Sequence, residues 1–469
     1  KHPCSFIGQI HLTPRMSLVL SESVVPRVPC HLWSSRRLLV RQEVVRAGHS
    51  ASTSDRRRVG VIALAVAALG QCCRGGLRAR RGLSSRARGR INVRSEAEPD
   101  RGFRVLEWAS SALGGQKALV KTASYLSRET WRTMVRELAP QSSTGDYVRP
   151  ASTLRAAPRD ANLKLSMGGH VAYVGNTCPW CHRVQLVLAL RRIEDEVANV
   201  TLLDEPERAS RGGWAFDPER GVSDPIFNAA DLREVYESSA SPKGGGSYIG
   251  RCTAPLLVDS RSRRAVSNDS EQIVRMLCEA KTGAATGASE SSEVDLLPPD
   301  LKDAITETNQ WTYRLLSNAV YRAGFATTQE AFERAVNDIT QGLDKADGIL
   351  SKSRFLCGDK VTEADAMLLP CAVRFDVVYA FLFLRGSCGL WRERPHLKRW
   401  LNEMWSLPGV RETCNIRACQ ESYYRTLFPL NPSQIIPKTV TGLETLCATE
   451  TIPLGHSAAA ELFHWRSSK

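Results

Sequence analysis

The pattern of apolar and polar residues between positions 165 and 281 predicts secondary-structure elements in the order strand, helix, strand, strand, strand, helix. The third predicted strand contains Pro255 near its start, where proline is tolerated, whereas inside a central strand it is not. The predicted elements are strands at 171–174, 200–203, 253–258 and 265–267, a helix that begins at Pro179 and a helix capped by residues 268–271. This order predicts an α/β domain over residues 165–281.

A long polar stretch, 204–250, separates the second and third of these strands. It is rich in Gly, Pro, Ser and charged residues, and it contains the aromatic run Trp214-Ala215-Phe216. A loop of this length in a compact domain is more often functional than idle. We therefore expect the stretch to contribute to a site.

Beyond a low-complexity linker at 282–297, every strong hydrophobic pattern has helical spacing. Threonine and acidic residues at 362–365 form a capping pattern that opens a buried helix. The other predicted helices cover 301–319, 328–350 and 397–404. The sequence thus predicts an all-α domain over 298–437, followed by a disordered tail at 438–469.

The basic charge of the chain is concentrated at its N-terminal end. The net charge is +14, and residues 1–94 hold 18 Lys and Arg but three acidic residues, so the rest is nearly neutral. This distribution argues against a nucleic-acid-binding face on the folded domains, although an RNA-binding basic arm is an alternative. Arg-, Ser- and Ala-rich, acid-poor leaders are typical of organelle transit peptides. We therefore expect a disordered targeting leader over 1–100, with a plastid as destination and another organelle or the cytoplasm as alternatives.

Two further features of the N-terminal part qualify this expectation. The apolar run at 59–70 follows three arginines, as in a signal peptide, but its 12 residues are too few to span a bilayer, which needs about 20. No membrane span is therefore expected in the mature chain. Residues 101–164 form an extension in which 102–139 carry apolar side chains at helical spacing, so we expect one or two amphipathic helices there.

Among 14 scattered cysteines, Cys178 and Cys181 have a spacing that indicates chemistry. They follow a buried strand, and Pro179 fits the first turn of the next helix. This context is that of a thioredoxin-like unit, in which Cys178 lies at a helix N-terminus. A free thiol has a pKa of about 8.5, and such settings lower it to about 3.5–7.5. The other cysteines are expected to be reduced, small apolar residues; they include Cys278, Cys357, Cys371, Cys388, Cys414 and Cys419.

Several spaced motifs extend over residues 145–437. They are CPWCHR at 178–183, GWAF at 213–216, GRCTAP at 250–255, SNDSE at 267–271, NAVYRAGFA at 318–326, TEAD at 362–365, RFDVVY at 374–379 and Asn431-Pro432. In this order they resemble the glutathione transferase superfamily, and within it the cysteine-type Xi class of glutathionyl-hydroquinone reductases. The resemblance implies a thioredoxin-like N-terminal domain followed by an all-α C-terminal domain.

The resemblance also implies roles for individual residues. Cys178 would attack the sulfur of a glutathionyl-hydroquinone, release the hydroquinone and carry glutathione as a mixed disulfide. Pro255 would be a cis-proline. Glutathione would be the co-substrate, bound by Trp214, Arg251, Ala254, Pro255, Asp269 and Ser270, and Tyr321 and Tyr379 would face the aromatic acceptor. The family forms dimers through its helical domain, so a homodimer acting on quinone-derived conjugates is expected, with no metal and no nucleic acid.

Two positions depart from the family pattern. Cys181 stands where alanine is usual, which opens a resolving role for this second thiol. Asp269 stands where Glu is usual. Two other functions therefore stay open: an Omega-like thioltransferase or dehydroascorbate reductase, and a non-catalytic binder of glutathione conjugates or of an iron–sulfur cluster. Simple structural roles also stay open, with Trp214 as a packing anchor, Tyr321 and Tyr379 as core residues, and Asp269 and Ser270 as a helix cap.

Overall fold

The computed structural model describes residues 115–156, 163–204, 213–240, 248–281, 294–389, 394–427, 429–438 and 461–465. The predicted leader lies outside the described residues, as does the part of the extension that precedes residue 115. Residues from Val120 onward belong to one compact unit, which contains both predicted domains. The first described element is helix α4 (Gln116–Leu138), which accounts for one of the amphipathic helices expected over 102–139.

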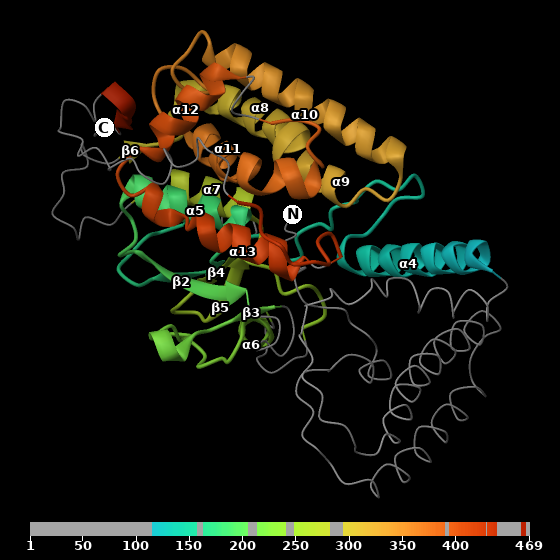
Figure 1. Ribbon diagram of the computed structural model, residues 1–469. Helices are drawn as coiled ribbons and strands as arrows, with labels where there is room; N and C mark the ends of the chain where they lie inside the picture. The colour runs from blue at the N-terminus through green and yellow to red at the C-terminus, as the bar shows by residue number, and fades with distance from the viewer. Residues whose placement is uncertain are drawn as a thin grey trace, which may run out of the picture. The chain divides into compact units, whose positions relative to one another are not determined.

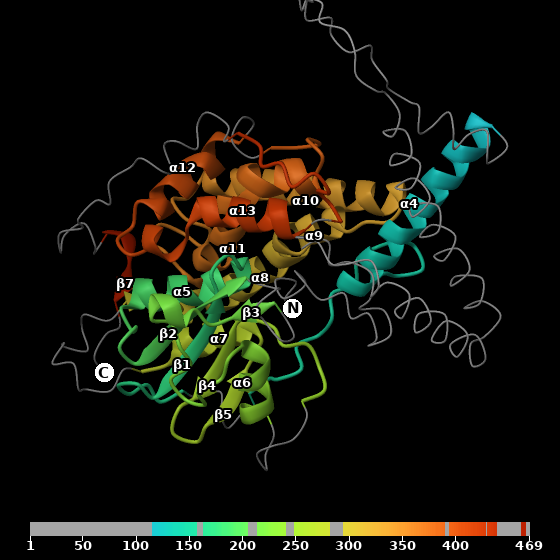
Figure 2. The same cartoon turned by 60° about the horizontal axis from the view of Figure 1, so that its bottom comes forward.

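The N-terminal domain is built on a five-stranded sheet of order β3-β2-β1-β4-β5. Strands β1 and β2 run parallel, whereas the other neighbouring pairs are antiparallel. Helices α5 and α7 lie on the face that meets the helical domain, and α6 lies on the other face (Figures 1 and 2). The elements are β1 (His170–Gly175), α5 (Pro179–Arg191), β2 (Val197–Asp204), β3 (Trp214–Ala215), α6 (Leu232–Ser239), β4 (Leu256–Asp259), β5 (Arg264–Ser267) and α7 (Ser270–Glu279). The α/β thioredoxin-like prediction is confirmed, with α6 as a helix that the sequence pattern did not predict.

The C-terminal domain is helical, as predicted, and its helix α11 packs against α5 and α7. Two segments within it are π-helical, so the helix predicted over 301–319 is interrupted and the buried helix after Thr362 changes its winding. The sequence pattern also missed α13. The elements are α8 (Lys302–Thr312), η8 (Tyr313–Ser317), α9 (Ala319–Gly324), α10 (Gln329–Leu350), α11 (Glu363–Arg374), η9 (Phe375–Phe383), α12 (Pro395–Trp405) and α13 (Ile416–Thr426).

The N-terminus of α11 is held by the buried carboxylate of Asp365. Its two oxygens accept from the backbone N–H of Leu356 at 3.0 Å and of Thr362 at 2.9 Å, and from Trp400 Nε1 at 2.9 Å. The Thr362 hydroxyl donates a further bond at 3.0 Å. The predicted capping pattern is therefore confirmed, and it joins α11 to α12 as well as capping the helix.

A second buried carboxylate, Glu363, stands in the first turn of the same helix. Its Oε1 accepts from Arg275 at 2.9 Å and from Asn309 Nδ2 at 2.8 Å. Burial raises the pKa of Glu363 to about 7, although the nearby Arg275 opposes the shift. The folded chain therefore binds a proton at Glu363 more tightly than the unfolded chain does.

This shift predicts a pH dependence of stability. The carboxyl pKa is near its ordinary 4.5 in the unfolded chain and about 7 in the folded one, so the folded state binds more protons between those values. The free energy of unfolding is expected to fall as pH rises through this window and to level off above it. Glu363→Gln should flatten this fall in urea denaturation at pH 5 and pH 8, whereas exposed Glu307→Gln should leave it unchanged. Equal pH dependence in all three chains would contradict the assignment.

The part of the predicted disordered tail that the structure describes is ordered. Strand β7 (His464–Trp465) pairs antiparallel with β6 (Val294–Asp295), at the end of the predicted linker. The backbone N–H of Val361 donates to the carbonyl of Leu462 at 2.7 Å, and Phe463 is buried. The disorder prediction is therefore wrong for 461–465, because short apolar segments order when a partner edge is available.

Among the described residues one helical stretch, Glu363–Phe383, has the length and composition of a membrane span. It is 21 residues long, and an 18-residue window within it has a mean hydropathy of 1.7 and is 89% buried inside the protein. Such burial is typical of the central helix of a helical domain.

Candidate functional site

Cys178 ends the connection between β1 and α5 and is the N-cap residue of α5. Its backbone is extended, with φ −70° and ψ 119°, and Pro179 occupies the first helical turn, as predicted. The thiol is 1% exposed and lies 3.7 Å from the carbonyl oxygen of Ala254. The Ala254–Pro255 peptide bond is cis, as the family resemblance implied. A helix N-terminus and a fixed cis-proline loop thus meet at this sulfur.

Cys181 lies one turn further along α5 and is completely buried. Its sulfur accepts a hydrogen bond from the backbone N–H of Gly175 at 3.1 Å. Burial raises the pKa of Cys181 well above its usual range, and the neighbouring Cys178 sulfur adds to the increase. Cys181 therefore keeps its proton and can donate it in a hydrogen bond to the neighbouring Cys178 sulfur.

Trp214 is buried, and its ring lies against the backbone of β1. A Cβ placed on Gly175 would come within 2.3 Å of the Trp214 ring, so the tryptophan occupies the space that a side chain would need. Trp214 is therefore a packing residue at the end of β1, one loop away from Cys178. Arg251 is half-buried, and its guanidinium lies 3.5 Å from the Leu138 carbonyl oxygen, at the end of α4.

Asp269 and Ser270 begin helix α7, at the edge of the same domain. Asp269 accepts from the backbone N–H groups of Glu271 and Gln272 at 3.1 and 3.4 Å, so it is the N-cap of α7. Arg155 lies 3.1 Å from its other oxygen. The cap role of Asp269 is confirmed, and the positive end of α7 beside it is a setting that favours an anionic group.

Three tyrosine hydroxyls meet in the helical domain. Tyr321 Oη lies 2.7 Å from Tyr423 Oη and 3.3 Å from Tyr379 Oη, and the last two are 3.5 Å apart. The sequence indicated Tyr321 and Tyr379 but missed Tyr423, since it lies on the unpredicted helix α13. Burial raises the pKa of Tyr379 above its usual value, so its hydroxyl keeps its proton and can donate.

Aromatic stacking connects these tyrosines to the cysteine loop. The ring of Trp180, which lies between the two cysteines in sequence, stacks on Tyr321 with a centroid distance of 6.1 Å. Arg149 places its guanidinium over both rings, 4.4 Å from Trp180 and 5.2 Å from Tyr321. Its Nε donates to Asn318 Oδ1 at 2.6 Å, whereas its two terminal nitrogens have no hydrogen-bond partner in the described part of the chain. Sequence reasoning missed Arg149, which lies in the extended approach before the domain.

The backbone that presents Cys178 is held from the helical domain by a buried arginine. Arg374 donates to the Thr177 carbonyl at 3.1 and 3.2 Å, and its third nitrogen lies 3.0 Å from His182 Nδ1. Burial lowers the pKa of His182 well below its usual range, and Arg374 adds to the decrease. His182 is therefore neutral, accepts from Arg374, and its Nε2–H donates to Thr413 Oγ1 at 2.7 Å.

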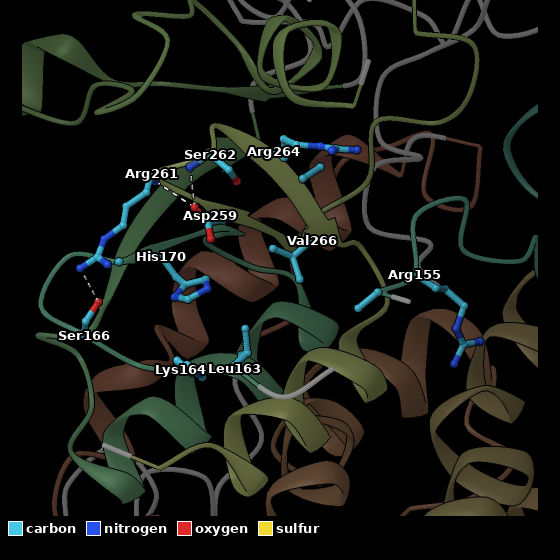
Figure 3. Close-up of a pocket in the computed structure, with 13 residues that line it drawn as sticks. Arg155, Leu163, Lys164, Ser166, His170, Asp259, Arg261, Ser262, Arg264 and Val266 are labelled. Carbon is cyan, nitrogen blue, oxygen red and sulfur yellow. Dashed lines mark hydrogen bonds between the residues drawn. The ribbon is translucent and has the colours of Figure 1, made fainter. Parts of the chain in front are cut away.

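A cavity of about 710 Å³ lies at the opposite end of the central strand. It is lined by Arg155, Lys164, His170, Asp259, Arg261 and Arg264, among other residues (Figure 3). Because β1 runs from His170 to Gly175, this cavity and Cys178 are separated by roughly 16 Å of strand. The cavity lining includes neither Cys178 nor the Ala254–Pro255 loop, so the candidate site around the sulfur lies apart from this cavity.

No group of three or more His, Cys, Asp or Glu side chains that could hold a metal ion occurs among the described residues. The chemistry that the described geometry supports is that of a sulfur nucleophile at a helix N-terminus, with an aromatic, hydroxyl-rich surface beside it.

Sequence comparison places the chain in a family. Residues 177–280 match the family model of the glutathione S-transferase N-terminal domain, and 329–403 match that of the C-terminal domain. The chain is 36% identical over 302 residues to the glutathionyl-hydroquinone reductase PcpF of Sphingobium chlorophenolicum, with 63% of this chain and 90% of that protein covered. The protein therefore belongs to the glutathione transferase family.

Solved structures narrow the likeness to one branch of that family. The glutathione S-transferase Xi of Phanerochaete chrysosporium is 31% identical and superposes with a TM-score of 0.56, covering 64% of this chain and 95% of that one. The glutathione-bound structure of YqjG, a glutathione transferase homologue of Escherichia coli K-12, is 30% identical with a TM-score of 0.52 and covers 58% and 85%. The chain is thus similar to Xi-class, glutathionyl-hydroquinone reductase-like transferases.

Proposed function

We propose that this protein is a glutathione-dependent reductase of glutathionyl-hydroquinones, acting through a mixed disulfide between Cys178 and glutathione. The observation that carries the proposal is the position of the Cys178 sulfur. The sulfur stands at the N-terminus of α5 and against the cis Ala254–Pro255 loop. Trp180, in the first turn of the same helix, stacks on Tyr321 of the tyrosine cluster. The relation to PcpF and to the glutathione-bound YqjG structure supports the same chemistry.

The reaction consists of two thiolate exchanges that balance without another redox group. The Cys178 thiolate attacks the glutathione sulfur of the conjugate, an S–S bond forms and the bond between sulfur and the ring carbon breaks. That carbon takes the electron pair and one proton, which releases the hydroquinone. A second glutathione thiolate then attacks the mixed disulfide, restoring the Cys178 thiolate and giving glutathione disulfide.

The groups next to the sulfur suit an aromatic acceptor. Trp180 and Tyr321 are buried and stacked on each other here, so an acceptor ring would take the place of part of this packing. The tyrosine hydroxyls would then donate to ring oxygens or supply the proton that the ring carbon takes. Arg149 brings a positive charge over the same rings, with terminal N–H groups that can donate to a phenolate or carboxylate oxygen. The neutral His182 is occupied by Arg374 and Thr413, so it is not assigned as the base.

The decisive assay follows purified protein with a glutathionyl-hydroquinone and glutathione, and measures hydroquinone and glutathione disulfide by chromatography. Equal molar amounts of the two products are expected. A mixed-disulfide substrate such as glutathionylated cysteine, with dehydroascorbate, serves as comparison. Turnover of these comparison substrates in the absence of hydroquinone release would instead identify an Omega-like thioltransferase or dehydroascorbate reductase.

Removal of single hydroxyls tests the acceptor surface. Tyr321→Phe and Tyr423→Phe each remove one partner of the 2.7 Å contact while keeping the ring. We expect each to lower kcat for the hydroquinone conjugate by about 10-fold, a loss typical of one general acid–base or hydrogen-bonding group. Tyr424→Phe on the same helix is the matched control, because its hydroxyl has no hydrogen-bond partner among the described residues, and it should stay near the wild-type rate. Unchanged kcat in both cluster variants would contradict the assignment.

A targeting leader and a homodimer remain part of the proposal. The acid-poor, Arg- and Ser-rich composition of residues 1–94 supports delivery to a plastid.

A further inference from the structure

Two cysteines outside the proposed reaction, Cys414 and Cys419, are in contact. Both lie in the helical domain, close to α5 of the thioredoxin-like domain, and their sulfurs are 3.9 Å apart. Cys414 immediately precedes Asn415, the N-cap of α13, and Cys419 lies in that helix. Their spacing of five residues matches no redox or metal motif, and the sequence analysis predicted both as reduced, small apolar residues.

The surroundings of this pair favour ionisation of one thiol. The positive charge of buried Arg374 acts on this pair and favours a thiolate at Cys414. The hydrogen bond from Cys419, together with Arg374, lowers the pKa of Cys414 to about 7 despite burial. The same hydrogen bond and burial raise the pKa of Cys419 well above its usual range. Of the two thiols, Cys414 is therefore the one that ionises more readily, with Cys419 within reach as a hydrogen-bond donor.

Cys371 shows that Arg374 alone is not sufficient to lower the pKa of a buried thiol. Cys371 is also buried, and the charges of Arg183 and Arg374 also act to lower its pKa, yet burial raises that pKa to about 12. The difference is the second thiol, because a thiolate that accepts an S–H hydrogen bond is stabilised over and above any Coulombic gain.

We propose that Cys414 and Cys419 are a second redox centre of this protein, which peroxide oxidises to an intramolecular disulfide independently of Cys178. The inference does not depend on the proposed hydroquinone reaction. The two sulfurs are already in contact, and an S–S bond of about 2.05 Å requires them to approach by roughly 2 Å. Both residues are buried, and Cys414 is the less deeply buried, at 8% exposure against 0% for Cys419. A small oxidant such as hydrogen peroxide suits this limited access better than a disulfide of glutathione size.

The oxidation is balanced in two steps. The Cys414 thiolate attacks one peroxide oxygen, the O–O bond breaks, and a sulfenic acid and hydroxide are formed. The Cys419 sulfur then attacks the Cys414 sulfur and displaces hydroxide, while the Cys419 proton completes a water molecule. In total, two thiols and one peroxide give one disulfide and two waters. Glutathione or another thiol reverses the reaction by exchange.

The pair also borders the backbone that presents the catalytic sulfur. Cys419 Sγ lies 3.9 Å from the Thr177 carbonyl oxygen, which also accepts from Arg374. Thr413, next to Cys414, is bonded to His182 of α5. The second redox centre is thus separate from Cys178 in chemistry and adjacent to it in space.

Peptide mapping of the full chain tests the proposal directly. Trypsin cleaves after Arg411, Arg417 and Arg425, so Cys414 and Cys419 fall in separate peptides, 412–417 and 418–425. Reduced protein is treated with a small molar excess of hydrogen peroxide, quenched in acid, alkylated under denaturing conditions and digested. Mass spectrometry is expected to find the two peptides joined, with two hydrogens lost, and separated again by a reductant.

Variants assign the bond. Cys178→Ser and Cys371→Ser should both retain the cross-link, whereas Cys419→Ser should abolish it and leave Cys414 as a sulfenic or higher acid. Because the cross-link is measured in the wild-type chain, the test does not depend on the folding of any variant. Recovery of both peptides fully alkylated after peroxide would overturn the proposal, as would cross-links that join Cys414 or Cys419 only to Cys178 or Cys181.

Discussion

Replacing Cys178 by serine is expected to lower kcat/KM for a glutathionyl-hydroquinone by at least about 10³-fold. Serine keeps the size and the hydrogen bond to the Ala254 carbonyl, but its hydroxyl is not ionised at neutral pH and does not exchange with sulfur. The loss should fall on kcat more than on KM, since the glutathione-binding groups remain. Steady-state rates and mass spectrometry for a glutathione adduct of about 305 Da at residue 178 would be measured together.

Two other thiols provide the comparison for this variant. Cys371→Ser removes a buried thiol of the helical domain and should keep the wild-type rate. Cys181→Ser removes the thiol that stays protonated beside Cys178 and should retain most of the activity if one sulfur suffices. Full activity in the Cys178 variant would refute the covalent route. Loss of activity in the Cys181 variant, with a Cys178–Cys181 disulfide in the wild-type protein, would establish a dithiol route.

The largest stability effect is expected at Asp365. Its carboxylate satisfies the backbone N–H groups of Leu356 and Thr362, the Thr362 hydroxyl and the Trp400 indole, all of them buried. Asp365→Ala leaves these donors without an acceptor, and each buried unsatisfied group costs about 1–3 kcal/mol. The free energy of unfolding should fall by about 3–5 kcal/mol, a large part of the stability of a typical domain.

Urea denaturation followed by tryptophan fluorescence and circular dichroism measures this loss. Asp303→Ala, on the exposed side of α8, is the matched control and should change the free energy of unfolding by less than about 0.5 kcal/mol. Asp365→Asn keeps one carbonyl oxygen and should fall between the two. A loss below about 1 kcal/mol in Asp365→Ala would show that water replaces the missing bonds.

The thioredoxin-like domain could be predicted from the sequence because its signals are local. Pro179 fits the first turn of a helix, and residues 268–271 cap another. The short apolar run before Cys178 is typical of a buried strand. The capping pattern at Thr362 was equally clear. By contrast, α6 and α13 are short helices rich in polar residues, whose stability comes from packing that periodicity does not show.

The site was only partly predictable for the same reason. Cys178 and Cys181 lie in one contiguous motif, so their proximity follows from chain order, whereas the position of Pro255 beside them was implied by the family resemblance. Tyr423, Arg149 and Arg374 come from three distant segments and meet through tertiary packing alone. The contact between Cys414 and Cys419 is similar, since it depends on the turn that leads into α13. Such clusters become visible when side-chain positions are known.

The π-helical segment η9 carries Tyr379 and Phe383 into the aromatic cluster, where their rings stack with centroids 5.3 Å apart. A π-helix closes its hydrogen bonds one residue later than an α-helix, so it accommodates an inserted residue within an otherwise continuous helix. An α-helix turns by about 100° per residue. Deleting one residue between Phe375 and Tyr379 is therefore expected to tighten this stretch towards α-helical winding and to repack both rings against Tyr321. In evolutionary terms, a change of one codon here is expected to act first on the aromatic cluster, because the π-helical stretch is where this helix takes up a difference in length.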